Sequence, residues 1–184
     1  MIALELDAAG RPHALYSVQV GSAGLPVGQG GDDIRYRMAH FDGQAWHDAA
    51  LAFGGSRLYA GEDDYSGLVA FDPDDLFTVY LSANADPALG TPLISAADGR
   101  RHHELFVATS SDRGQSWSFT ALTRDSSFDR LRPMVVRAPD GQKILISLCG
   151  TYSSFRSYQQ RVIGLFFRGS LLDALAAGNL PPAP

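Results

Sequence analysis

LDAAGRPHALYS at residues 6–17 aligns without gaps with FDPDDLFTVYLS at residues 71–82 and with VRAPDGQKILIS at residues 136–147. Successive windows end 65 residues apart, at Ser17, Ser82 and Ser147. Each window places a turn rich in Asp, Gly and Pro before an alternating apolar run, which is the pattern of a β-hairpin. A hairpin repeated at fixed spacing predicts an architecture built from similar antiparallel units.

A second repeated pair follows the first. IRYRMAHFDGQAWHDAAL at residues 34–51 matches ELFVATSSDRGQSWSFTAL at residues 104–122, and both contain Gly-Gln-x-Trp. Each unit therefore combines two hairpins joined by a long loop. Four-stranded units at regular spacing are typical of β-propeller blades, so we predict an all-β, partial β-propeller, with a β-sandwich as the alternative.

The repeat gives the expected organisation of residues 1–184. We place blade 1 at about residues 2–55, blade 2 at about 65–124, an incomplete blade 3 at about 131–168, and a helix and tail at 170–184. Ser170 and Asp173 form a capping-box pattern and Gly178 a stop signal, so a short helix is expected between them. The tail LPPAP is expected to be disordered or to pack as an extended cap. Closed propellers need four or more blades, so the chain is expected to be part of a longer protein that holds the missing blades.

Composition agrees with a β-rich globular chain and excludes several functions. The 184 residues are 45% hydrophobic and 19% charged, with 19 Gly and 10 Pro, which suits short strands joined by turns. Fifteen Lys and Arg against 20 Asp and Glu give a net charge of −5, which argues against a nucleic-acid partner. We find no apolar run long enough for a membrane span and no secretory signal at the N-terminus. The single cysteine, Cys149, excludes an intramolecular disulfide and is expected to be buried.

Residues 110–117, SSDRGQSW, match the Asp-box pattern S-x-D-x-G-x-S-W in full. Asp112 is expected to accept backbone N–H groups within its turn, Gly114 to supply a positive φ, and Trp117 to pack over the turn. We therefore interpret Ser110, Asp112, Gly114 and Trp117 as structural residues. Residues 39–46 form a degenerate second copy of the motif.

The chain resembles the BNR (Asp-box) repeat propellers, and more closely the BNR repeat-containing family that includes ulvan lyases and rhamnose–glucuronate-cleaving enzymes. The resemblance runs from Ala3 to about Arg168. Its segments are residues 58–68 (LYAGEDDYSGL), 72–75 (DPDD), 78–80 (TVY), 101–104 (RHHE), the Asp-box and 129–133 (DRLRP). The resemblance implies a secreted or periplasmic parent protein that acts on a polysaccharide or oligosaccharide.

Propeller topology places the functional loops at the end opposite the Asp-box turn. Those loops are residues 19–33, 56–66, 84–103, 125–133 and 150–161. In the lyases that the chain resembles, a Tyr or His takes the proton from C5 of a uronate while a cation neutralises the carboxylate. Tyr65 is the expected acid/base and Arg132 the expected carboxylate partner, held extended by Pro133. The alternatives are a packed tyrosine within a solvated acidic turn and a salt bridge between Arg132 and Asp64.

Other residues of these loops complete the predicted site. His102 is the expected auxiliary base, and we expect Glu62, Asp64, Arg101, Tyr152 and Arg156 to contact substrate. His102 and His103 would point to opposite faces of a strand and make a poor zinc signature, so neither a metal nor a cofactor is expected.

Three functions remain open from the sequence. The first is cleavage of a uronate- or rhamnose-containing polysaccharide, by β-elimination or by glycosidic cleavage. The second is glycan or protein binding without turnover. The third is sialidase-like hydrolysis, against which stands the lack of three assignable arginines.

Overall fold

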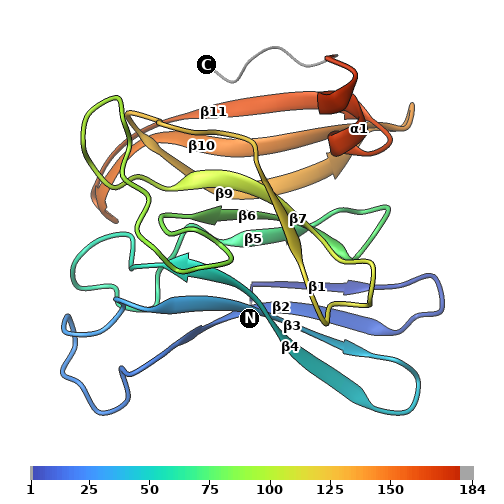
Figure 1. Ribbon diagram of the computed structural model, residues 1–184, viewed down its shortest axis with the longest axis horizontal. Coiled ribbons are helices and arrows are strands. Elements are labelled where there is room, and N and C mark those ends of the chain that lie inside the picture. Colours follow the sequence, from blue (N-terminus) through green and yellow to red (C-terminus); the bar gives the residue numbers. More distant parts are fainter. Residues whose placement is uncertain (1, 179–184) are drawn as a thin grey trace.

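The computed structural model describes residues 2–178 and is mostly β, with three antiparallel sheets and a short C-terminal helix (Figure 1). The first sheet has the order β1 (Ala3–Leu6), β2 (Pro12–Gln19), β3 (Ile34–Phe41) and β4 (Trp46–Gly55). The second has the order β5 (Val69–Phe71), β6 (Thr78–Ala83), β7 (Glu104–Thr109) and β8 (Ser118–Ala121). The third has β10 (Gln142–Ser154) between β9 (Asp129–Arg137) and β11 (Ser157–Arg168).

The three sheets follow one another in space in the order of the chain (Figure 1). Leu15, Tyr36 and Met38 of the first sheet share one core with Val79 and Leu81 of the second. A second core, between the second and third sheets, contains Tyr80, Val107, Leu145, Phe167 and Leu171. The second sheet is therefore covered on both faces. For this reason β6 is buried on both sides and shows no alternation between buried and exposed residues.

A buried ion pair also joins the second and third sheets. Lys143 Nζ lies 2.8 Å from both carboxylate oxygens of Asp72, and the Tyr80 hydroxyl donates to the same carboxylate at 2.9 Å. Both charged side chains are nearly inaccessible to solvent. Burial, with the carboxylate of Asp72 as the second cause, raises the pKa of Tyr80 far above its ordinary value.

The Asp-box turn has the hydrogen bonds that its sequence suggests. Asp112 accepts the Ser116 N–H at 2.9 Å and the Ser110 hydroxyl at 2.8 Å. The hydrogen bonds from Ser116 make the largest contribution and, with the bond from Ser110, lower the pKa of Asp112 to about 2. Gly114 has a φ of 83° and is buried beneath the Trp117 ring. In the degenerate copy, Asp42 accepts the N–H groups of Gln44 and Ala45.

The third window does not keep the register that the gapless alignment implies. The alignment equates Val79 and Leu81 with Ile144 and Ile146, yet the residue of β10 that packs on the second sheet is Leu145. Because side chains alternate along a strand, a displacement of one residue exchanges the two faces of the sheet. Val79 and Leu81 face the preceding sheet, whereas on β10 it is Leu145, and not Ile144 or Ile146, that faces the preceding sheet. The gapless alignment therefore matches residues that lie on opposite faces of the second and third sheets.

Helix α1 (Leu171–Ala176) follows β11 and buries Leu171. Ser170 is its N-cap residue, but its side chain makes no capping hydrogen bond, so the predicted capping box does not form. Gly178 has a φ of 67° and donates to the Leu175 carbonyl, which ends the helix. The tail LPPAP lies outside the described residues. In the described part of the chain, no helix has the length and apolar character needed to cross a membrane.

Candidate functional site

Four tyrosines from two distant segments meet at one end of the third sheet. Tyr59 and Tyr65 come from the loop between β4 and β5, whereas Tyr152 and Tyr158 face each other across the β10–β11 hairpin. Ring centroids are 6.1 Å apart for Tyr59 and Tyr65, 5.5 Å for Tyr59 and Tyr152, 5.8 Å for Tyr65 and Tyr152, and 5.7 Å for Tyr152 and Tyr158. These four residues are called the tyrosine cluster below.

Arg132 adds a cation to the tyrosine cluster. Its guanidinium carbon lies 5.2 Å from the centroid of the Tyr65 ring, within the range of a cation–π interaction. The side chain is exposed, so the charge is open to a ligand. The alternative salt bridge with Asp64 is not formed, because Asp64 instead accepts a hydrogen bond from Gln19.

A β-bulge directs Arg132 toward the tyrosines. Leu131 pairs with Leu148 and Met134 pairs with Ile146, so Arg132 and Pro133 together face one residue of β10. Arg132 has a φ of 52°, and the prediction that Pro133 holds it extended is therefore wrong. The bulge overrides the local preference before proline and re-aims the arginine side chain. A positive φ at a non-glycine residue costs free energy that the surrounding structure must offset.

The tyrosine hydroxyls differ in their environment. The Tyr65 hydroxyl is buried and has no hydrogen-bond partner within residues 2–178. Tyr158 is 60% exposed and presents its ring to solvent. Burial, followed by the charge of Glu62, raises the pKa of Tyr59 above its ordinary value. The cluster therefore offers exposed aromatic surface with a buried phenol behind it.

The acidic turn before Tyr65 is mainly a loop anchor. Asp63 accepts the N–H groups of Gly28 at 2.7 Å and Gly30 at 3.3 Å, and Arg57 Nη1 lies 3.0 Å from it. Burial opposes the shift, but these bonds hold the pKa of Asp63 below its ordinary value. Glu62 and Asp64 are both exposed; the charge of Glu62 acts on Tyr59, whereas Asp64 accepts a hydrogen bond from Gln19.

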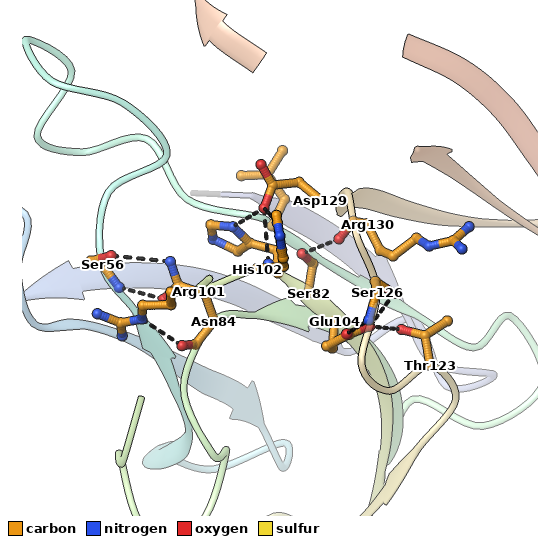
Figure 2. A network of polar contacts seen from close by, with 12 residues as sticks. Ser56, Ser82, Asn84, Arg101, His102, Glu104, Thr123, Ser126, Asp129 and Arg130 are labelled. Atoms are coloured by element: carbon orange, nitrogen blue, oxygen red, sulfur yellow. Dashed lines mark hydrogen bonds and ion pairs between the residues drawn. The ribbon is translucent and has the colours of Figure 1, made fainter. Parts of the chain in front are cut away.

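His102 and His103 meet at a single carboxylate, that of Asp129 (Figure 2). Asp129 accepts the His103 N–H at 2.9 Å, and the Nδ1 atoms of His103 and His102 lie 3.4 and 3.7 Å from it. Both rings reach one partner because β7 begins only at Glu104, so strand alternation has not started. Burial raises the pKa of Asp129, but the hydrogen bonds and charge of His103 outweigh it, and the pKa is lowered.

The histidine–aspartate group is joined to the tyrosine cluster through Gly67. The Gly67 carbonyl accepts the Arg132 N–H at 2.8 Å. A Cβ at Gly67 would overlap Ser82 Oγ and lie 2.8 Å from the His103 ring, so only glycine fits there. The Ser82 hydroxyl in turn donates to the Arg130 carbonyl at 2.5 Å. This packing fixes the backbone of both loops behind Tyr65 and Arg132.

Arg101 and Arg156 lie in other surroundings. Arg101 Nε donates to the Asn84 carbonyl at 2.7 Å, and the Asn84 side chain bonds Ser56, so Arg101 secures the β6–β7 loop (Figure 2). Burial lowers the pKa of Arg101. Arg156 is exposed and lies over its neighbour Phe155, 5.0 Å from the ring centroid.

The structure thus brings together three of the predicted residues, Tyr65, Arg132 and Tyr152. Within residues 2–178, His102 contacts Asp98 and Asp129, Arg101 contacts Asn84, Arg156 contacts Phe155 and Asp64 contacts Gln19, rather than the tyrosine cluster. Sequence reasoning missed Tyr59, Tyr158 and Asp129. A usable signal existed for Tyr158, because Tyr152 and Tyr158 flank the tight turn of a hairpin and so pair across it.

No cluster of three or more His, Cys, Asp or Glu arranged to hold a metal ion occurs among residues 2–178. Comparisons of the chain with protein-family models, with curated proteins and with solved structures found no match.

Proposed function

We propose that the protein recognises a uronate-bearing polysaccharide at the tyrosine cluster. The observation that carries the proposal is the position of Arg132 over Tyr65, in a cluster whose exposed ring, Tyr158, stacks on Tyr152. Aromatic faces pack against the apolar faces of sugar rings, and a guanidinium pairs with a carboxylate through two parallel hydrogen bonds. The combination suits an acidic sugar better than a neutral one.

The proposed architecture is a partial β-propeller whose loops gather at one end. The first strands of successive sheets adjoin, since β1 contacts β5 and β5 contacts β9, as blades around an axis would. The tyrosine cluster and Arg132 draw on residues 56–66, 125–133 and 150–161, which the propeller topology assigns to one end. This agreement between topology and contact supports the proposal.

Cleavage by β-elimination is the second candidate. The Tyr65 phenolate would take the C5 proton of the uronate, the electrons would form the C4–C5 double bond, and the C4–oxygen bond would break as the Tyr65 phenol so formed returns that proton to the leaving oxygen. Arg132 would stabilise the carboxylate as charge develops on it. The unpartnered Tyr65 hydroxyl favours this reaction, although its burial requires a neighbouring ring to move before substrate reaches it. Sialidase-like hydrolysis has less support, because within residues 2–178 Arg132 is the one arginine that lies over a ring of the tyrosine cluster.

The test is titration calorimetry with a polyuronate and with a neutral glucan of similar length. We expect binding of the polyuronate alone, weakened at least tenfold by Arg132→Gln and by Tyr158→Ala. Arg113→Gln and Trp46→Ala are matched controls, because both alter exposed side chains near the Asp-box turns. Equal binding of both glycans, or no effect of Arg132→Gln, would contradict the proposal. Ultraviolet absorbance of an unsaturated uronate in the same mixtures reports elimination separately from binding.

A further inference from the structure

The third sheet has one apolar face that nothing covers within residues 2–178. Register places Ile144 beside Val136 on β9 and Phe166 on β11, Ile146 beside Met134, and Leu148 beside Val162. Met134 is 60% exposed, Val136 43%, Val162 69% and Phe166 56%. The opposite face buries Leu145 and Phe167 against the second sheet. These seven outward residues are called the third-sheet outer face.

The first sheet, at the other end of the stack, also has an uncovered apolar area. Leu4 is 54% and Leu6 63% exposed, and they pair with Ala14 and Pro12 of β2. Their neighbour Ala3 pairs with Leu15, which is buried toward the second sheet. Leu4, Leu6, Ala14 and Val18 therefore lie on the side turned away from the second sheet, and they are called the first-sheet outer face.

The sequence repeat indicates which kind of surface packs on the first-sheet outer face. At the 65-residue spacing, Leu4 and Leu6 correspond to Val69 and Phe71 of the second sheet. Val69 and Phe71 are 3% and 6% exposed, because they pack on the face of the preceding sheet. The first-sheet outer face thus carries apolar side chains at the positions that, one repeat later, cover a neighbouring sheet.

We propose that two copies of this chain associate head to tail, with the first-sheet outer face of one copy on the third-sheet outer face of the other. This contact continues the existing stack, in which β1 adjoins β5 and β5 adjoins β9, by setting β9 of one copy beside β1 of the next. Two such contacts related by a twofold axis close a ring, which removes both exposed faces. Arg37 on β3 and Asp48 on β4 lie farther from β1 than the apolar residues of the first-sheet outer face, whereas Tyr16 lies on β2 between Ala14 and Val18 and donates its hydroxyl to Asp48, which also accepts from Arg37. The inference stands independently of the proposed glycan site.

Sedimentation equilibrium of the 184-residue chain tests the association. We expect the mass of two chains, and dissociation constants at least tenfold weaker for Val162→Lys and for Leu6→Glu. Val27→Lys is the matched control, because Val27 is 89% exposed in a loop outside both faces. Circular dichroism checks that the variants fold, and Phe166→Ser replaces Val162→Lys if that chain does not. A monomer throughout the accessible concentration range overturns the proposal.

An equimolar mixture of the two single variants distinguishes the head-to-tail arrangement from the symmetric one. In a head-to-tail pair, the mixture restores one unaltered contact and brings the introduced lysine and the introduced glutamate together at the other. Mixed dimers should therefore exceed either homodimer in native mass spectrometry. In a symmetric contact between two third-sheet outer faces, Leu6→Glu would leave the dimer intact and mixing would restore nothing. That result would overturn the proposal.

Discussion

The guanidinium carbon of Arg132 lies 5.2 Å from the centre of the Tyr65 ring, and Arg132 reaches this position with a φ of 52°. The arginine occupies the bulge of β9, whereas the tyrosine belongs to the loop that precedes β5. A left-handed conformation at a non-glycine residue is unfavourable in isolation. The structure therefore maintains a strained residue at the point where the cation meets the tyrosine cluster.

Two replacements of Arg132 should distinguish the cost of its positive φ from the contribution of its guanidinium to polyuronate binding. Arg132→Gly and Arg132→Ala both remove the guanidinium, but only glycine adopts a positive φ without steric cost. We expect the glycine variant to be more stable than the alanine variant by about 1 kcal/mol in urea unfolding. Both variants should lose polyuronate affinity to the same extent. An alanine variant as stable as the glycine variant would show that the bulge is not strained.

The buried pair of Lys143 and Asp72 should be important for stability. Lys143→Met leaves a carboxylate buried without its cation, so we expect a loss of about 3 kcal/mol in the free energy of unfolding. In the double variant Asp72→Asn/Lys143→Met the loss should be smaller than the sum of the single effects, because the charges are removed together. Arg168→Met, which breaks an exposed pair with Asp140, should cost less than about 1 kcal/mol and serves as the control.

A ladder of three histidines should make stability depend on pH. His13, His40 and His47 are cross-strand neighbours on β2, β3 and β4, with centroids 5.4 and 5.1 Å apart. Burial lowers the pKa of His13 and of His40 below the ordinary value of 6.5, and Asp7 opposes the shift at His13. The remaining charged groups that face the ladder are Arg11, Asp42 and Arg113.

The sign of this effect follows from the lowered pKa values. Because these pKa values are lower in the folded chain, the unfolded chain binds protons more readily. The contribution of His13 and His40 to the free energy of unfolding is therefore fully present above pH 6.5 and declines as the pH falls toward the folded pKa values. His40→Phe keeps a ring between His13 and His47 but cannot titrate. Urea unfolding at several pH values between about 8 and about 5 should therefore give a smaller decline for this variant. An unchanged decline would exclude His40 as a source of the pH dependence.

The Asp-box should affect stability and leave binding unchanged. Asp112→Ala removes the acceptor of the Ser116 N–H and of the Ser110 hydroxyl, so the melting temperature should fall. Because the pKa of Asp112 is lowered to about 2, its contribution is present above the ordinary pKa and is lost as the pH falls toward 2. Polyuronate affinity measured well below the melting temperature should equal that of the unaltered chain. A selective loss of binding would assign the motif a functional role.

Some features of this molecule follow directly from residue patterns. The hairpin windows predict antiparallel strands, and the stop signal at Gly178 predicts the end of the helix; both predictions are confirmed. The grouping of Tyr65, Arg132 and Tyr152 also follows, because repeat topology assigns their loops to one end. His102 shows the limit of this reasoning. Its Nε2 lies 2.8 Å from Asp98 in its own loop, but its second carboxylate neighbour, Asp129 at 3.7 Å, lies on the third sheet, and the sequence spacing gives no indication of that contact.

The sequence by itself determined the strands, their turns and the pairing within each sheet, because these depend on local hydrogen bonding and on alternation over a few residues. The tertiary structure alone decided which face of the third sheet is buried and how Arg132 is directed. A shift of one residue exchanges the faces of a strand, and the bulge at Arg132 and Pro133 overrides the local preference for an extended backbone. Both outcomes depend on packing between sheets, which no single window of the sequence contains.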